Sequence, residues 1–240
     1  MNGRDGTDAV EPSTDRPTST WVGVFAVAVA VFAVCALIAS NGEVAGWEEA
    51  VFHAINDLPD WLYGPMWVFQ LAGLLFVPLV VAVGAAFFRR WRLVAALVVL
   101  VPLKLVVEKL VVKQLVERER PGTTVCGAPD DFDDTCGNFR GDVPLDGLSF
   151  VSGHTIIAWG VATLLWPVLP GRWKWLPIVI AVLNAAARVY LGAHNPLDVV
   201  GGAAVGIATG AVLVMVFDPG VTSRRRAGRP RRREERARTR

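Results

Sequence analysis

The sequence has little charge for its length. Charged residues make up 19% of the 240 positions and hydrophobic residues 53%, and the mean hydropathy is +0.43. A soluble domain of this length carries more charge and fewer long apolar runs, so the composition argues against an ordinary soluble protein. The sequence also lacks a long polar linker between its apolar runs, which argues against a second domain.

Cysteine and histidine are scarce, with three residues of each. Cys35 lies in an apolar run, where a thiol behaves as a small hydrophobe. Cys126 and Cys136 flank the polar stretch GAPDDFDDT, and no nearby His or further Cys completes a zinc site. If that stretch is extracytoplasmic, we expect a disulfide between Cys126 and Cys136; two unpaired thiols are the alternative.

In contrast to its few charged residues, the sequence contains several long apolar segments. A membrane-spanning helix needs about 20 mostly apolar residues. Six segments reach or approach this length, at residues 21–40, 61–88, 91–112, 153–169, 173–191 and 197–217. We therefore expect an all-α fold, a polytopic membrane bundle of six transmembrane helices.

Three regions follow from this pattern. Residues 1–20 are expected to be a disordered cytoplasmic tail, residues 21–217 the six-helix membrane domain, and residues 218–240 a basic cytoplasmic tail. The first apolar segment could be read as a signal peptide. The twenty residues before it are not net positive and its apolar run is long, so we favour an uncleaved helix.

Basic residues predict the orientation in the cell membrane. Arg89, Arg90 and Arg92 lie between the second and third segments, Arg172 and Lys174 lie between the fourth and fifth, and residues 224–240 follow the sixth. With alternating spans all three places share one side, which the positive-inside rule makes cytoplasmic. Both termini are then cytoplasmic. The loop at 41–60, which has no Lys or Arg, faces outward, and its apolar residues recur at helical spacing, as in a helix along the membrane surface.

The basic C-terminal tail has two interpretations. We expect it to touch anionic membrane lipid, each basic residue near the surface adding about 1 kcal/mol. Nucleic acid is the alternative partner, and the positive-inside pattern argues against it.

Ionisable residues in membrane segments are costly and usually mark a functional site. In the third segment, Lys109, Lys113 and Arg120 fall within about 40° of one another on a regular helix, which predicts a cationic stripe. Lys104 and Glu108 are predicted on the opposite side, four residues apart, where they can pair. The alternative is that Lys109 and Lys113 reach towards lipid headgroups.

Two further clusters begin the fourth and sixth segments. Ser152, Gly153 and His154 combine a hydroxyl, a backbone that a ligand can approach and an imidazole at a helix N-terminus, which suits phosphate. Ser152 as a simple N-cap is the alternative.

Arg188, His194 and Asp198 form the other cluster. Asn195, Pro196 and Asp198 predict a helix start that brings Asp198 back towards His194, where it can hold one ring N–H. The alternative is that Asp198 only caps the helix.

Two other polar features have simpler interpretations. His53 is expected to be an interfacial surface residue of the first outer loop. The acidic run Asp130, Asp131, Asp133 and Asp134 lacks the ligand spacing of an EF-hand, so a solvated loop is favoured over a calcium site.

The three polar clusters together resemble the signature of the type 2 phosphatidic acid phosphatase superfamily. Its first motif, Lys, six residues, Arg-Pro, matches Lys113 to Arg120-Pro121. Its second motif matches Ser152-Gly153-His154, with Val151 in place of the usual proline. Its third matches Arg188, His194 and Asp198 at the family's spacing, with Ala187 in place of serine. The family also contains soluble vanadium haloperoxidases, against which the membrane segments argue.

The resemblance implies a role for each residue. His194 is the nucleophile that forms a phosphohistidine, Asp198 orients it, and His154 protonates the leaving oxygen and then activates water. The remaining residues stabilise charge on the phosphoryl oxygens, namely Lys113, Arg120, Ser152, Gly153 and Arg188. Because three fixed cations can replace a metal ion, we expect neither a metal nor another cofactor.

The expected substrate is a lipid phosphate or diphosphate at the extracytoplasmic face. Phosphatidic acid, undecaprenyl diphosphate and phosphatidylglycerol phosphate all suit a cationic interfacial cleft, and the resemblance favours undecaprenyl diphosphate. Transfer of the phosphoryl group to another lipid is the enzymatic alternative. A six-span transporter is the non-enzymatic one, although its charges would spread across the membrane depth. The sequence does not indicate an oligomeric state.

Overall fold

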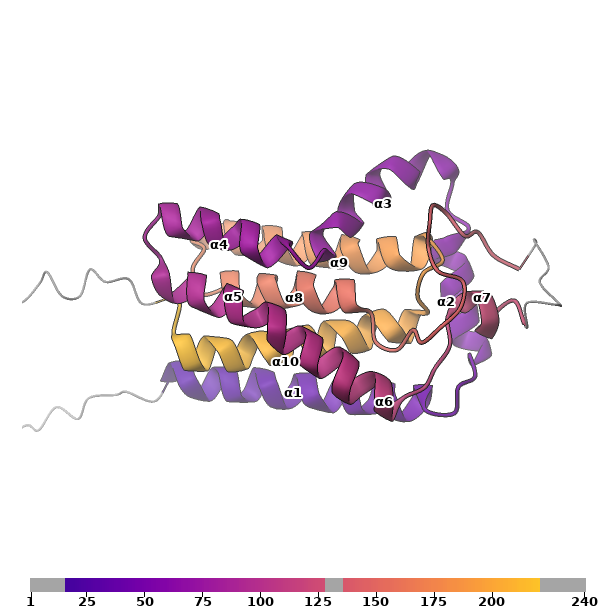
Figure 1. Ribbon diagram of the computed structural model, residues 1–240, viewed down its shortest axis with the longest axis horizontal. Coiled ribbons are helices and arrows are strands. Elements are labelled where there is room, and N and C mark those ends of the chain that lie inside the picture. Colours follow the sequence, from indigo (N-terminus) through magenta and orange to yellow (C-terminus); the bar gives the residue numbers. More distant parts are fainter. Residues whose placement is uncertain (1–15, 128–135, 221–240) are drawn as a thin grey trace, which may run out of the picture.

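The computed structural model describes residues 16–127 and 136–220, and within these ranges every regular element is helical apart from one β-bridge between Glu119 and Leu148 (Figure 1). The all-α prediction is confirmed for this part of the chain. Most of the predicted N-terminal tail, the basic run at 224–240 and the acidic run at 130–134 lie outside the described residues.

Five long elements form the bundle, joined by shorter helices at its ends. The long helices are α1 (Arg16–Ala39), α5 (Trp91–Leu105), α8 (Gly153–Leu165), α9 (Trp175–Tyr190) and α10 (Pro196–Phe217). Between them lie α2 (Gly46–Asn56), α3 (Tyr63–Gln70), α4 (Val77–Phe87), α6 (Lys113–Leu115) and α7 (Pro121–Thr124). Figure 1 shows α1, α8, α9 and α10 side by side along the long axis, with α5 and α6 crossing them obliquely.

Fewer helices than the six expected are long and apolar enough to count as membrane spans. Thr18–Ala39 and Pro196–Phe217 are long and apolar enough, and a third span is present if Asp60–Gly73 and Val77–Phe87 together make one bent crossing. The other long helices are shorter, at 13 to 16 residues. The described residues therefore carry two or three candidate spans by this measure, and the count of six is not established by it.

The second predicted span is not one helix. It consists of a 3₁₀ turn η1 (Asp60–Leu62), α3, a second 3₁₀ turn η2 (Leu71–Gly73) and then α4, with a bend of 71° between the two halves. Pro78 lies in the first turn of α4, where its missing N–H costs nothing. The bend brings η2 against α8.

The third predicted span is also irregular. After α5 the chain winds through the π-helical segment η3 (Val106–Val112), and the helix ends with α6 at Leu115. A π turn closes its hydrogen bonds five residues apart, so side chains beyond it leave the regular 100° spacing. Because the helix ends at Leu115, Arg120 lies in the loop before α7 and not on the helix surface.

Glycines let α10 approach α8 closely. A Cβ added to Gly202 would lie 2.7 Å from the Ser152 carbonyl oxygen, one on Gly206 would lie 2.6 Å from that of Ile156, and one on Gly210 would meet the Thr163 side chain at 2.6 Å. Three glycines spaced by four residues lie on one face of a helix, so their face of α10 is flat enough for backbone contact. This contact fixes α8, which carries His154 in its first turn, against α10, which begins two residues after His194.

We predict that Gly206→Ala destabilises the bundle, because the added methyl would have to displace the backbone of α8. Overpacking of this kind costs about 1–3 kcal/mol. Thermal unfolding of the purified protein in detergent should show a lower midpoint than that of the wild type.

Gly84→Ala is the matched control. Gly84 also lies within a helix, but nothing lies within 4 Å of an added Cβ there. An equal loss of stability in both variants would show that helix contact is not the cause.

Candidate active site

A pocket of about 440 Å³ gathers most of the candidate residues. Those that line it come from α6, the loop before α7, α8, α9 and the loop before α10, and they are Lys113, Arg120, Gly153, His154, Arg188 and His194. The other two candidates, Ser152 and Asp198, are fully buried beside Gly153 and His194. All three sequence clusters therefore meet in one place.

Asp198 has two contacts that bear on its role. One carboxylate oxygen, Oδ2, accepts the backbone N–H of Asn195 at 2.8 Å, which caps the start of α10. The same oxygen lies 3.6 Å from Nδ1 of His194, slightly beyond hydrogen-bond distance. Catalytic hydrogen bonds are often long before a substrate is bound. Capping and orientation of the imidazole are thus compatible, because one carboxylate reaches both groups.

The charge state of His194 follows from its surroundings. Complete burial lowers its pKa well below the ordinary value, and the guanidinium groups of Arg188 and Arg120 and the ammonium of Lys113 lower it further. The backbone of Ser149 acts weakly in the opposite direction. The ring is therefore neutral at physiological pH, which leaves one nitrogen with a lone pair.

Arg188 and Arg120 are held in place by neutral oxygens. Nη1 of Arg188 donates to the side-chain oxygen of Gln70 at 2.6 Å, and Nη1 of Arg120 donates to the Ala193 carbonyl at 2.8 Å. These bonds fix the guanidinium groups without neutralising their charge. The pocket consequently has positive charge available for an anion.

The positions of Lys104 and Glu108 differ from those predicted relative to the cationic stripe. The two side chains form an ion pair, as expected, but they line the same pocket as Lys113, whose Nζ lies 3.4 Å from Glu108 Oε1. Lys109 is exposed and does not line it. The prediction that Lys104 and Glu108 face away from Lys113 is wrong because the π turn of η3 displaces the helical phase between them.

The start of α8 is packed tightly. Ser152 is the residue before the helix, yet its side chain makes no capping bond, and its buried Oγ has no partner within the described ranges. A Cβ on Gly153 would lie 2.6 Å from Glu108, and one on Gly73 would lie 2.5 Å from the Cβ of His154. Gly73 was not identified from the sequence, and it allows η2 to press directly on the His154 backbone.

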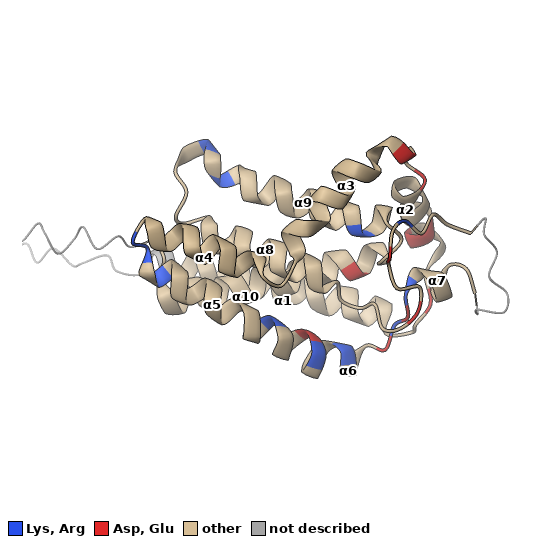
Figure 2. Ribbon diagram, turned by 45° about the horizontal axis from the view of Figure 1, so that its top comes forward, with Lys and Arg blue, Asp and Glu red and all other residues tan. Residues whose placement is uncertain are grey.

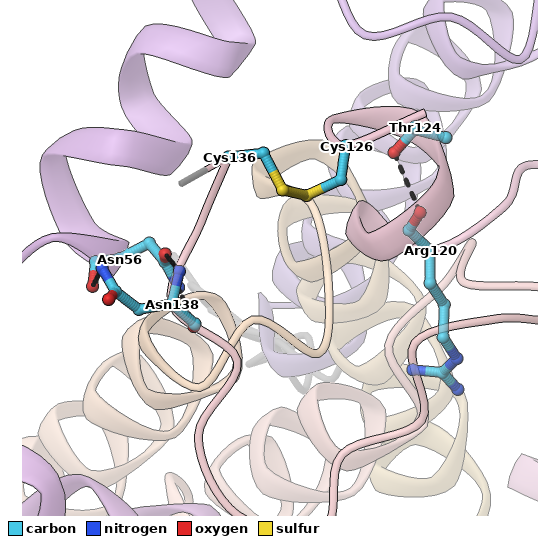
Figure 3. The surroundings of a disulfide bond; sticks show 6 residues. All are labelled: Asn56, Arg120, Thr124, Cys126, Cys136 and Asn138. Atoms are coloured by element: carbon cyan, nitrogen blue, oxygen red, sulfur yellow. Dashed lines mark hydrogen bonds between the residues drawn. A yellow bond between two sulfur atoms is a disulfide. The ribbon is translucent and has the colours of Figure 1, made fainter. Parts of the chain in front are cut away.

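The loop after residue 136 lines the pocket and is anchored at several points. Cys126 and Cys136 form a disulfide with a Cα–Cα distance of 5.2 Å (Figure 3). Asn56 Oδ1 accepts the Asn138 N–H at 2.6 Å, as Figure 3 shows. Arg140 donates to the carbonyl oxygens of Asn56 at 2.7 Å and Tyr190 at 2.9 Å. These contacts hold the loop on the end of α9, beside Arg188.

Three polar residues near the site were missed by sequence reasoning. Gln70 contacts Arg188, while Arg118 is fully buried and forms ion pairs with Glu48 at 2.6 Å and Asp198 at 3.5 Å. Glu48 shares a face of α2 with buried residues four and eight positions later, a spacing that marks it as inward-facing. Nothing in the local sequence separates Arg118 from its exposed charged neighbours.

The described part of the chain shows no cluster of side chains that could ligate a metal ion. No three side chains of His, Cys, Asp or Glu gather there in an arrangement that could hold an ion. The polar groups of the pocket are mainly nitrogen donors that carry positive charge, a set suited to an anion.

Known proteins are similar to parts of this chain in sequence and to most of it in fold. The sequence model of the PAP2 superfamily matches residues 91–219, which include every candidate catalytic and phosphate-binding residue. A stretch of 56 residues is 46% identical to an undecaprenyl-diphosphatase from Sulfolobus acidocaldarius, covering 22% of this chain and 26% of that protein.

Two crystal structures are similar in fold. Aquifex aeolicus LpxE matches with a TM-score of 0.59 and 26% identity, over 69% of this chain and 93% of that one. The first transmembrane PAP2-type phosphatidylglycerolphosphate phosphatase from Bacillus subtilis matches with a TM-score of 0.60, over 85% and 98% of the two chains. At 24% identity, the second likeness concerns the fold alone.

We predict that the His194 ring stays neutral as the pH falls through 6.5, because burial and neighbouring cations lower its pKa. Arg188→Gln should raise that pKa, since one cation is removed while burial remains. Nitrogen-15 NMR of the histidine rings measures both titrations. Arg172→Gln, at the other end of α9, is the control and should leave His194 unchanged; equal effects of the two substitutions would contradict the prediction.

Proposed function

The chain belongs to the PAP2 superfamily, and on that premise we propose that it is a membrane-embedded phosphatase that hydrolyses a lipid phosphate or diphosphate through a phosphohistidine. The observation that carries the proposal is the meeting of His194, His154 and three cations, Lys113, Arg120 and Arg188, around one pocket. A neutral buried imidazole beside several fixed positive charges suits attack on a phosphoryl group.

His194 is the nucleophile. Its Nδ1 faces Asp198, so Nε2 attacks phosphorus, and the bond between phosphorus and the leaving oxygen breaks. His154 donates a proton to that oxygen. In the second half His154 takes a proton from water, the resulting hydroxide attacks the phosphohistidine, and inorganic phosphate leaves with His194 restored. Asp198 stabilises the imidazolium while the covalent intermediate forms.

The phosphate-binding groups stabilise the charge that develops on the phosphoryl oxygens. Lys113, Arg120 and Arg188 supply cations, and Ser152 and Gly153 supply a hydroxyl and a backbone N–H at the start of α8. The buried Ser152 Oγ, which has no hydrogen-bond partner among the described residues, fits this role. With three fixed cations in place, the reaction proceeds without a metal ion.

A lipid is the proposed substrate, because the site lies at the end of a bundle with apolar outer surfaces. An apolar groove of about 300 Å³ is lined by residues of α1, α5, η3 and α10, which include Phe32, Leu103 and Val107. When the headgroup of a lipid binds in the pocket, apolar surface of this kind is available to its tail. The similarity to an undecaprenyl-diphosphatase favours a polyprenyl diphosphate among the candidates.

The proposed topology has six crossings and an extracytoplasmic site. The crossings are α1, the bent α3–α4 pair, α5 with η3 and α6, α8, α9 and α10. Figure 2 shows basic residues where α4 turns into α5 at one end, and acidic residues near α2 and α7 at the other. The positive-inside rule makes the first end cytoplasmic and places the pocket outside, with both termini and the basic tail in the cytoplasm.

We predict that His194→Ala abolishes phosphate release from lipid phosphates and diphosphates, because it removes the imidazole that forms the covalent intermediate. A panel containing undecaprenyl diphosphate, phosphatidic acid and phosphatidylglycerol phosphate should be assayed with purified protein, with and without chelator and with no added acceptor. The wild type should release inorganic phosphate in both conditions. Rapid quenching should trap the phosphoryl group on His194.

The control is His53→Ala, since His53 lies in α2, half-exposed and outside the pocket. It should retain activity. Hydrolysis at the wild-type rate by His194→Ala would contradict the nucleophile, and loss of activity with chelator would contradict metal independence.

We predict that an impermeant thiol reagent labels Glu49→Cys in intact cells and labels Arg172→Cys only after permeabilisation. Glu49 is exposed on α2 at the end that holds the site, and Arg172 is exposed between α8 and α9. The background is low, because Cys35 is buried and Cys126 and Cys136 are joined. The reverse pattern would place the pocket on the cytoplasmic side.

A further inference from the structure

We propose that Arg118 and Glu48 are positioning residues that hold the Asp198 carboxylate in the orientation that His194 needs. The inference rests on the proposed function, and it concerns residues that lie outside the pocket. Its basis is a chain of charged groups, Glu48 to Arg118 to Asp198, in which each of the three side chains is almost completely buried.

Arg118 divides its guanidinium between the two carboxylates. Nη2 donates to Glu48 Oε2 at 2.6 Å, while Nη1 donates to Glu48 Oε1 at 3.0 Å and lies 3.5 Å from Asp198 Oδ1. A planar guanidinium with two bonds to Glu48 has little freedom to rotate. The cation is therefore presented to Asp198 at a fixed position.

The two oxygens of Asp198 then have separate partners. Oδ1 faces Arg118, and Oδ2 faces the Asn195 N–H and Nδ1 of His194. Rotation of the carboxylate would break contacts on both sides. Arg118 thus fixes which oxygen is turned towards the nucleophile, although it does not itself reach the pocket.

Glu48 also holds the helix that carries Asp198. Its Oε1 accepts the backbone N–H of Leu197 at 2.9 Å, one residue before Asp198 in the first turn of α10. A carboxylate at that place is favoured by the unpaired N–H groups and the dipole of the helix. Through this contact α2, which contributes no pocket residue, is tied to the start of α10.

The backbone of Arg118 joins the remaining part of the site. Its carbonyl oxygen accepts the Ser149 N–H at 2.8 Å, three residues before Ser152. Ser149 Oγ donates to the neighbouring Glu119 carbonyl at 2.7 Å. One residue thereby contacts the segment before α8 through its backbone and the start of α10 through its side chain.

A purely structural role explains the arrangement less well. Desolvation makes buried ion pairs poor sources of stability, and apolar residues of similar volume often replace them without loss. Groups that orient the ligands of a metal site, in contrast, typically change activity by about 10- to 100-fold when altered, and we expect the same range for groups that orient a nucleophile. The two roles predict different results in a variant that removes the charges of Glu48 and Arg118 together, so that neither of these two residues is left charged without the other.

The experiment compares Glu48→Gln, Arg118→Lys and the double variant E48Q/R118M with the wild type. The double variant removes both charges together, and the amide oxygen that replaces the Glu48 carboxylate can still accept the Leu197 N–H. Glu49→Gln is the matched control, one residue away and exposed. For each protein, kcat and KM on the same lipid phosphate, the inhibition constant of inorganic phosphate and the thermal midpoint are measured.

We expect kcat of E48Q/R118M to fall by about 10- to 100-fold. Its KM and its inhibition constant for phosphate should stay within about twofold, since Lys113, Arg120 and Arg188 are untouched. Arg118→Lys should recover part of the kcat because an ammonium still faces Asp198. The kcat of Glu48→Gln should lie between those of E48Q/R118M and Arg118→Lys, and the kcat of Glu49→Gln should match that of the wild type.

An unchanged kcat in E48Q/R118M would overturn the positioning role. So would a loss of phosphate affinity and thermal stability in parallel with kcat in all three variants, because that result describes general unfolding of the site. Failure of the proposed function looks different: His194→Ala would then remain active. If His194→Ala is inactive and E48Q/R118M is fully active, only the positioning role fails.

Discussion

The carboxylate of Asp198 is the single group on which the arrangement of the site depends. It is buried without exposure to water, and it meets Arg118, the Asn195 N–H and the His194 ring from three directions. A buried carboxylate is costly unless cations and hydrogen-bond donors surround it. The segments that carry these partners, the loop before α7 and the start of α10, must therefore pack together for the chain to bury it.

The pocket differs in its charge balance from the inner cluster, the buried group of Glu48, Arg118 and Asp198. Arg118 is matched by Glu48 and Asp198, whereas Arg120 and Arg188 are held by a backbone carbonyl and an amide side chain. Neutral acceptors fix a guanidinium in position and leave its charge for a ligand. The inner cluster thus provides rigidity, and the outer cations provide attraction for an anion.

Short motifs of the sequence identified residues that the structure brings together, whereas the assumption of regular helices predicted the fold less well. Lys113, His154 and His194 could be found because ionisable residues in apolar segments are rare. Arg118 and Gly73 could not, since their importance lies in tertiary contacts with Asp198 and His154. The prediction of opposite faces for Lys104 and Lys113 failed because it assumed an unbroken α-helix.

The two irregular helices explain why the spans were harder to predict than the site. The break between η2 and α4 begins after Gly73, which lies against His154, and the π turn of η3 carries Glu108 into the pocket. In a membrane, backbone that departs from the α-helix is tolerated where it is buried in protein or lines a polar cavity. Both departures occur at the pocket, and α1 and α10, which remain regular over 22 residues, qualify as spans by length and composition. The chain therefore departs from simple transmembrane geometry where the polar site requires it.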